Sequence, residues 1–142
     1  MNKDVQNKSI MEKIIVTVEL SKNNYAAYLE DLPGCISTGK TLEELKINIA
    51  EAVDFHLEGM REDGVEIPFS TDYELVYKFD AKSLLSHYNG VFTNAAMQRL
   101  TGINQRQLQR YASGASQPRN KQSKRITTAL HSLGRELLAI EL

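Results

Sequence analysis

The chain has 142 residues, of which 42% are hydrophobic and 25% are charged, which fits one ordinary globular domain or two small ones. Its net charge of −1 conceals a division, because residues 1–80 carry 8 basic and 16 acidic side chains while residues 81–142 carry 9 and 2. No stretch approaches the ~18 apolar residues that span a membrane, the first eleven residues do not resemble a signal peptide, and the single cysteine excludes an internal disulfide. We therefore expect a cytoplasmic protein without a metal site or a cofactor.

Three short strands are predicted at the start of the chain. Apolar and other residues alternate over 14–20, which is typical of a strand with one buried face. Turn-forming residues at 22–24 separate this strand from a return strand over 25–29. The break at 31–34 contains proline and glycine, and residues 35–39 then suit a third strand.

A helix and a fourth strand complete the first half. Thr41 and Glu44 have the spacing of a capping box, in which both side chains accept hydrogen bonds from the first amides of a helix. The helix is expected to end near Gly64, and its apolar stripe is Leu42, Leu45, Ile49, Val53, His56, Leu57 and Met60. Residues 73–79 alternate again. The predicted order is βββαβ, an antiparallel sheet covered on one face by the helix.

The pattern becomes entirely helical after Asp80, which can cap the next helix. The predicted helices cover residues 81–88, 93–100, 104–112 and 121–140. The predicted fold class is therefore α+β, with a polar extension over 1–13, a first domain over 14–79 and an all-α second domain over 80–142.

The second domain has the spacing of a helix-turn-helix. Gly102 suits the tight turn, and Asn104 can cap the helix that follows. The apolar residues that would lock the two helices together are Met97, Ile103, Leu108 and Tyr111. The outer face carries Gln and Arg, which suit adenine and guanine edges in the major groove, and the helix N-terminus can approach phosphate.

The segment YASGASQP at 111–118 resembles the loop after the recognition helix in the lambda-repressor/Cro-like (XRE) family. In that family the loop reaches the DNA backbone, so the cations that follow are expected to contact phosphates. The candidate DNA-binding residues are Asn104, Gln105, Arg106, Gln109, Arg110, Ser116, Gln117, Arg119, Lys121, Lys124 and Arg125. Gln98 departs from the motif, which usually has a small residue four positions before the turn glycine, so Ala95 and Ala96 or a tilted helix would have to allow the close approach. The alternative is an all-α interaction bundle with a basic, solvated face.

The first half resembles the HicB antitoxin family over residues 14–70. The segments that carry the resemblance are YAAYLEDLPGCISTG at 25–39, TLEE at 41–44, HLEG at 56–59 and GVEIP at 64–68. The resemblance implies a partial ribonuclease-H-like fold followed by a DNA-binding domain. It also implies a partner, the HicA-type toxin, which is a basic mRNA endonuclease whose RNA-binding surface the antitoxin covers.

The charge division supports this resemblance independently, because an acidic domain can occupy a surface that binds phosphates. The candidate toxin-binding residues are Glu30, Asp31, Glu43, Glu51, Asp54 and Glu58, which could equally be solvated surface acids. The basic half is expected to bind the operator of its own operon. The apolar residues Leu130, Leu133, Leu137, Leu138 and Ile140 suggest that it forms a homodimer or a higher assembly.

Two other classes of function stay open. The first is a stand-alone transcription regulator whose acidic domain senses a small ligand. The second is a metal-dependent nuclease, for which Glu19, Glu30 or Asp31, and Asp54 could be proposed as ligands. Their spacing matches no active nuclease motif, and the three histidines fall in separate helices, so we expect no catalytic residues and no enzymatic activity.

Overall fold

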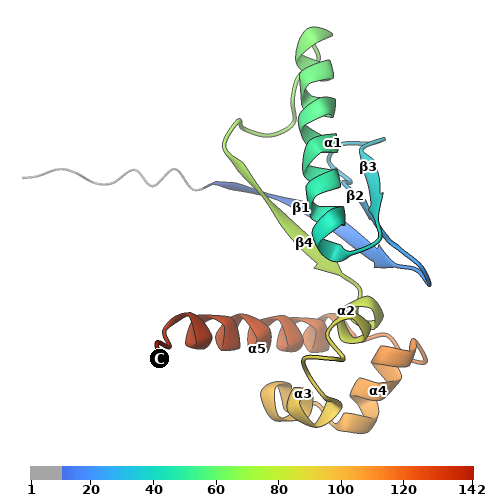
Figure 1. The fold of residues 1–142 in the computed structure, drawn as a ribbon, viewed down its shortest axis with the longest axis vertical. Helices are drawn as coiled ribbons and strands as arrows, with labels where there is room; N and C mark the ends of the chain where they lie inside the picture. Colours follow the sequence, from blue (N-terminus) through green and yellow to red (C-terminus); the bar gives the residue numbers. More distant parts are fainter. Residues whose placement is uncertain (1–10) are drawn as a thin grey trace, which may run out of the picture. The chain divides into compact units, whose positions relative to one another are not determined.

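The computed structural model describes residues 11–142 and divides into two compact units. The first unit ends at Lys78, and the second covers Phe79–Leu142 (Figure 1). Most of the predicted polar extension, residues 1–13, lies outside the described residues. The first strand begins at Glu12, two residues before the predicted start at Ile14.

The first unit contains a four-stranded sheet and one helix. Its elements are β1 (Glu12–Leu20), β2 (Tyr25–Tyr28), β3 (Ile36–Gly39), α1 (Leu42–Glu62) and β4 (Tyr73–Phe79). The strands lie in the order β3-β2-β1-β4, with β2 antiparallel to both β1 and β3. The predicted order βββαβ is confirmed, and so is the α+β class.

The direction of β4 differs from the prediction of an antiparallel sheet. The Glu12 N–H donates to the Asp72 carbonyl at 3.2 Å, which joins the start of β1 to the start of β4. Figure 1 shows the two arrows pointing the same way, so β4 is parallel to β1. The reason is the helical crossover, because α1 carries the chain back to the end of the sheet from which β1 starts.

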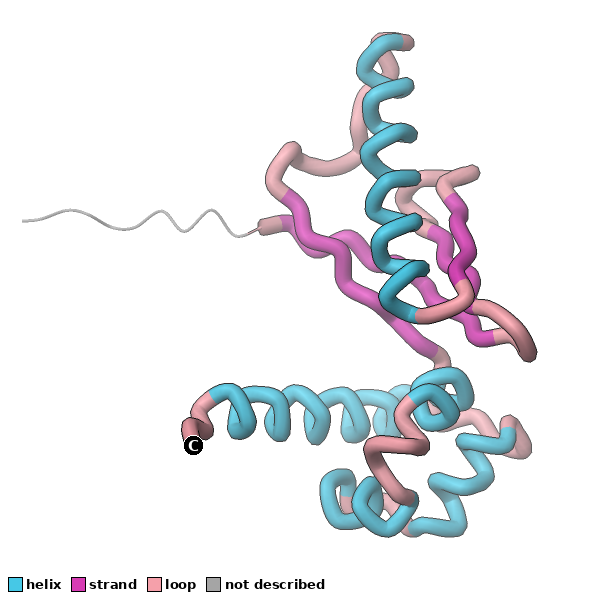
Figure 2. The backbone as a smooth tube through the Cα atoms, viewed as in Figure 1, coloured by secondary structure: helices cyan, strands magenta, loops and turns pink. Residues whose placement is uncertain are grey.

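The core of this unit lies between α1 and one face of the sheet (Figure 2). The alternating residues Ile14, Val16 and Val18 of β1 are buried against the apolar stripe of α1. Cys35 is also buried, which raises the pKa of its thiol. The opposite face of the sheet is not covered by any described element of this unit, and Ile15 and Ile36 on it are exposed.

The approach of α1 to β3 depends on Gly39. A Cβ atom at this buried position would lie 2.5 Å from the Leu45 backbone nitrogen. The Thr41 half of the predicted capping box forms beside it, since Thr41 Oγ1 accepts from the Glu44 N–H at 3.0 Å. The Glu44 carboxylate, however, accepts from the Lys40 N–H at 3.0 Å, one residue before the cap. This arrangement fixes the start of α1 against the end of β3.

The second unit is a bundle of four helices, α2 (Ala81–His87), α3 (Asn94–Thr101), α4 (Gln105–Ser113) and α5 (Asn120–Leu138). Asp80 caps α2 as predicted, because its carboxylate accepts from the Ser83 N–H at 2.6 Å. The buried core residues are Leu85, Met97, Ile103, Leu108, Tyr111 and Ile126. No helix within residues 11–142 is long and apolar enough to cross a membrane.

Candidate functional sites

The turn between α3 and α4 is held by local hydrogen bonds. Gly102 adopts φ +73°, and its N–H donates to the Gln98 carbonyl at 2.7 Å. The buried Thr101 hydroxyl donates to the Met97 carbonyl at 2.6 Å and accepts from the Ile103 N–H at 3.1 Å. These bonds connect the last turn of α3 to the residues of the turn, and they satisfy backbone groups that the end of a helix leaves unpaired.

The two faces of α4 differ in chemistry. Leu108 and Tyr111 are buried in one core cluster with Met97 and Ile103, as the helix-turn-helix spacing predicts. The opposite face exposes Gln105, Arg106, Gln109 and Arg110. No acidic residue occurs between Asp80 and Glu136, so nothing on this unit's α2, α3 or α4 would repel a phosphate. The face has the chemistry that direct reading of bases requires.

The N-terminus of α4 is capped by two side chains. Asn104 Oδ1 accepts from the Arg106 N–H at 2.8 Å, and Gln98 Oε1 accepts from the Gln105 N–H at 2.8 Å. Asn104 thus caps α4 as predicted, and both amides donate within the protein. Gln98, the residue that departs from the motif, is exposed and reaches across the turn instead of blocking it.

The loop after α4 is folded back onto the helix. The Ser116 N–H donates to the Arg110 carbonyl at 3.2 Å, and Gln107 Nε2 donates to the Ser116 hydroxyl at 3.3 Å. Ser116 is half-buried and braces the loop, whereas Gln117 and Arg119 are exposed. Sequence reasoning did not identify Gln107, because its partner lies nine residues away and no short motif signals the pair.

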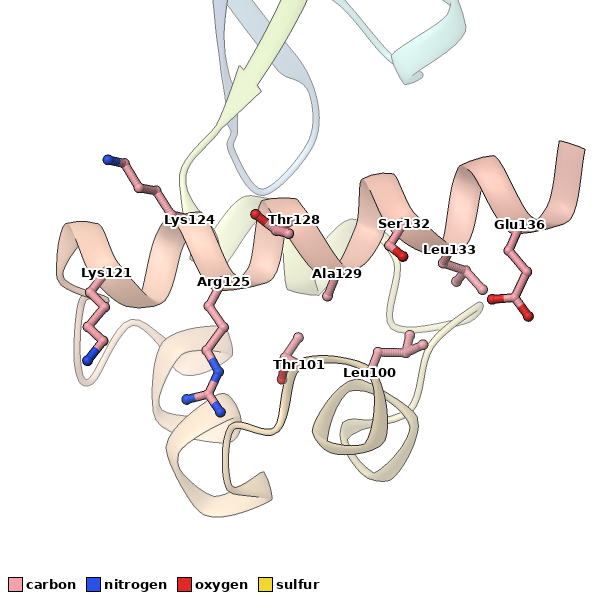
Figure 3. Close-up of a pocket in the computed structure, with 10 residues that line it drawn as sticks. All are labelled: Leu100, Thr101, Lys121, Lys124, Arg125, Thr128, Ala129, Ser132, Leu133 and Glu136. Atoms are coloured by element: carbon pink, nitrogen blue, oxygen red, sulfur yellow. The ribbon is translucent and has the colours of Figure 1, made fainter.

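The cations of α5 line an open groove of about 550 Å³ beside the turn. Lys121 and Arg125 extend from α5 toward the α3–α4 turn, while Lys124 extends the other way (Figure 3). The Arg125 guanidinium packs over Gly102, where a Cβ atom would lie 2.7 Å from its Nη2. All three cations are exposed. They can therefore contact phosphates, but from different sides of α5.

The candidate toxin-binding acids lie on two elements of the first unit. Glu30 and Asp31 are exposed in the β2–β3 loop, and the others are exposed on α1. Asp54 lies on the flank of α1 that faces β4, because its Oδ1 accepts from the Tyr73 hydroxyl at 3.1 Å. Burial and this hydrogen bond both raise the pKa of Tyr73.

Two apolar residues on α1 were missed by sequence reasoning. Phe55 is 80% exposed and Ile47 is 61% exposed. Neither belongs to the buried stripe of the helix, so their position outside that stripe is the signal that could have found them. They share the helix face with Glu51 and Glu58, since residues three and four apart are neighbours on a helix.

The acids proposed for a nuclease do not converge. Within residues 11–142, no three side chains of His, Cys, Asp or Glu are arranged to hold a metal ion. The metal-dependent nuclease therefore gains no support from the geometry.

Comparison with known proteins gives one family match. The family described as "HicB_like antitoxin of bacterial toxin-antitoxin system" matches residues 13–91, which is more than half of the chain. The match covers the sheet except for Glu12, includes α1 and α2, and ends before α3.

Three individual proteins are also similar. An uncharacterized 14.9 kDa protein from the rep-hol intergenic region of Haemophilus phage HP1 is 42% identical over 59 residues, which cover 42% of this chain. The chain spans only 44% of that phage protein's length. A UPF0150 protein of Helicobacter pylori is 38% identical over 50 residues, 35% of this chain and 69% of that protein. A UPF0150 protein of Thermoplasma acidophilum is 31% identical over 58 residues, 41% of this chain and 84% of that protein.

Proposed function

The chain belongs to the HicB-like antitoxin family of bacterial toxin–antitoxin systems, and from this premise we propose that it neutralises a HicA-type mRNA endonuclease and represses its own operon. The observation that carries the proposal is the division of charge between two compact units. The unit that the antitoxin match covers almost completely is acidic, and the unit whose α3 and α4 have the spacing of a helix-turn-helix is basic. Each unit therefore attracts a partner of the opposite sign.

The first unit is proposed to bind the toxin. A toxin that cleaves mRNA must present cations to RNA phosphates, and acidic side chains can occupy the same cations. Binding then blocks access of RNA without any catalytic step by the antitoxin. The proposed role requires no cofactor, and it places both partners in the cytoplasm, where the mRNA is.

The second unit is proposed to bind operator DNA through α4. Arg106 and Gln109 would read base edges, while Arg119, Lys121, Lys124 and Arg125 would contact phosphates. Helix-turn-helix proteins commonly bind as dimers to half-sites about 34–36 Å apart. We therefore propose a homodimer joined through the C-terminal part of α5, where Leu137 and Leu138 are 56% and 87% exposed.

Co-expression tests the toxin half of the proposal. A short basic reading frame is expected beside this chain's gene; it should arrest growth when expressed alone, and growth should recover when this chain is supplied. The two proteins should also purify together. Growth arrest that this chain does not relieve would contradict the antitoxin role.

Binding to the chain's own promoter DNA tests the other half. A shift at nanomolar protein that competitor DNA does not abolish is expected. Specific DNA binding by this chain together with the absence of a toxin gene beside its own gene would instead favour a stand-alone regulator that senses a small ligand.

A further inference from the structure

We infer that the toxin docks on the outer stripe of α1, with the Phe55 ring as the buried anchor of the complex. The outer stripe is defined as Ile47, Glu51, Phe55, Glu58 and Glu62. The inference rests on the proposed function, and it specifies which face of the acidic unit binds and what kind of surface must receive it.

The spacing of the stripe places its members on one side of the helix. Successive members are four, four, three and four residues apart, so their side chains form one row. The row lies opposite the buried residues Leu45 and Ile49, which are 0% exposed. Phe55 is therefore directed away from the protein's own core, at 80% exposure.

The stability of the helix does not explain this row. An exposed Phe gains nothing by facing water, and large exposed aromatic residues are enriched at interfaces. Glu58 and Glu62 are a like-charged pair four residues apart at the C-terminal end of α1, where the helix dipole disfavours anions and Arg61 is the one basic residue of the last turn. Both features become favourable when a basic, partly apolar surface covers them.

The outer side of α1 and the uncovered face of the sheet differ in charge, which decides between them as the surface for a basic partner. The uncovered sheet face also has apolar residues, including Ile36 at 68% exposure. Its exposed charges are mixed, however, because Lys13 and Lys78 accompany Glu19 and Glu74. The exposed side chains of α1 are net acidic instead, because six acids outnumber the two cations Lys46 and Arg61, and both cations lie outside the outer stripe. A basic partner is thus attracted to the helix face and not to the sheet face.

The chemistry of the stripe fits a surface built for RNA. An RNA-binding site offers cations to phosphates and planar or apolar side chains to bases. Glu51 and Glu58 flank Phe55 at four residues before and three residues after it. The carboxylates can take the places of phosphates while the ring takes the place of a base, and an arginine of the partner can lie over the ring.

The test uses the full chain and, as the probe, the purified product of the adjacent basic reading frame in a catalytically inactivated form. Phe55→Ala should weaken binding at least about tenfold, as expected for an anchor residue. Ile36→Ala is the matched control, because it also removes a large exposed apolar side chain but from the sheet face. It should bind like the wild type.

Charge reversal provides a second, independent measurement. The double variant E51K/E58K should slow association and reduce its dependence on salt, whereas E74K on the sheet face should change association far less. All variants should keep the wild-type melting temperature and affinity for promoter DNA, since the substituted residues are exposed.

The outcomes distinguish a wrong docking surface from a wrong proposed function. Equal binding of the toxin by Phe55→Ala and the wild type would show that the toxin does not bind the outer stripe. Loss of binding in Ile36→Ala instead would show the same, and both results would leave the antitoxin role intact. Absence of binding by the wild type would overturn both.

Discussion

The side-chain oxygen of Gln98 accepts a hydrogen bond from the backbone N–H of Gln105 at 2.8 Å, which links α3 directly to the first residue of α4. Together with Asn104, which binds the Arg106 N–H, Gln98 occupies two of the amides that a helix leaves unpaired at its start. A residue that departs from the usual small side chain of the motif thus contributes to the position of the proposed recognition helix.

Two substitutions of Gln98 should distinguish its effect on stability from its effect on DNA binding. Gln98→Ala removes the acceptor, and the expected cost is about 0.5–1.5 kcal/mol of unfolding free energy, measured by urea denaturation. Gln98→Glu keeps an acceptor and places an anion at the start of α4, so stability should be retained. Its affinity for promoter DNA should nevertheless fall, because the new charge faces phosphates. Wild-type stability in Gln98→Ala would show that the bond contributes nothing.

Arg106 is expected to read a base in the proposed complex. Arg106→Ala should cost about 1–3 kcal/mol of operator binding and relax the preference at one base position, as titration against a set of single-base operator variants would show. The double variant R106A/Q109A should lose specific binding altogether. If that variant binds the operator as the wild type does, α4 is not the recognition helix.

Lys124 is expected to act on phosphates alone. Lys124→Ala should weaken binding to operator and unrelated DNA by a similar factor, and the slope of log affinity against log salt should fall by about one. Figure 3 shows that Lys124 extends away from Lys121 and Arg125, so Lys121→Ala is an informative comparison on the other side of α5. A selective effect of Lys124→Ala on one base position would contradict a phosphate role.

Local patterns predicted most elements because their causes are local. The alternation over residues 14–20, the cap at Thr41 and the turn at Gly102 each depend on residues within a few positions, and all three occur where expected. The direction of β4 was predicted wrongly for the opposite reason. It depends on which end of the sheet the chain reaches after α1, and nothing within residues 73–79 encodes that.

As with the fold, the features of the candidate sites that have local causes could be predicted from the sequence. The buried and exposed faces of α4 follow from helical periodicity, so the proposed base-reading residues could be chosen from the sequence. The reach of Gln98 to Gln105 could not, because it depends on how the turn folds back. The exposure of Phe55 could have been inferred from the sequence, because Phe55 lies outside the apolar stripe predicted for this helix.

Gly39 should be intolerant of any side chain. Its Cβ would lie 2.5 Å from the Leu45 nitrogen and 2.8 Å from the Leu45 Cα, and backbone atoms cannot move aside without shifting α1. Gly39→Ala should therefore cost about 1–3 kcal/mol of unfolding free energy, as an overpacked core position does. Gly59→Ala is the control, because Gly59 lies within α1 with nothing within 4 Å of its Cβ position. It should stabilise the protein by about 0.5–1 kcal/mol. Equal stability of the two variants would contradict the close approach of α1 to β3.

The C-terminal part of α5 should carry the proposed dimer. Leu130 packs against the core of the second unit, whereas Leu137 and Leu138 are 56% and 87% exposed. L137E/L138E places two charges in an apolar contact, so sedimentation should show a shift from dimer to monomer at micromolar concentration. Operator affinity should fall with it, because a monomer engages one half-site at a time.

The control for this variant is Val91→Glu, which introduces a charge at an apolar residue of the same unit that is 69% exposed. It should leave both the dimer and operator binding unchanged. The far-ultraviolet circular dichroism of all these variants should match the wild type, since each substituted side chain is exposed. A dimer that survives L137E/L138E would place the interface elsewhere, and a wild type that is monomeric while it represses would exclude the two-half-site arrangement itself.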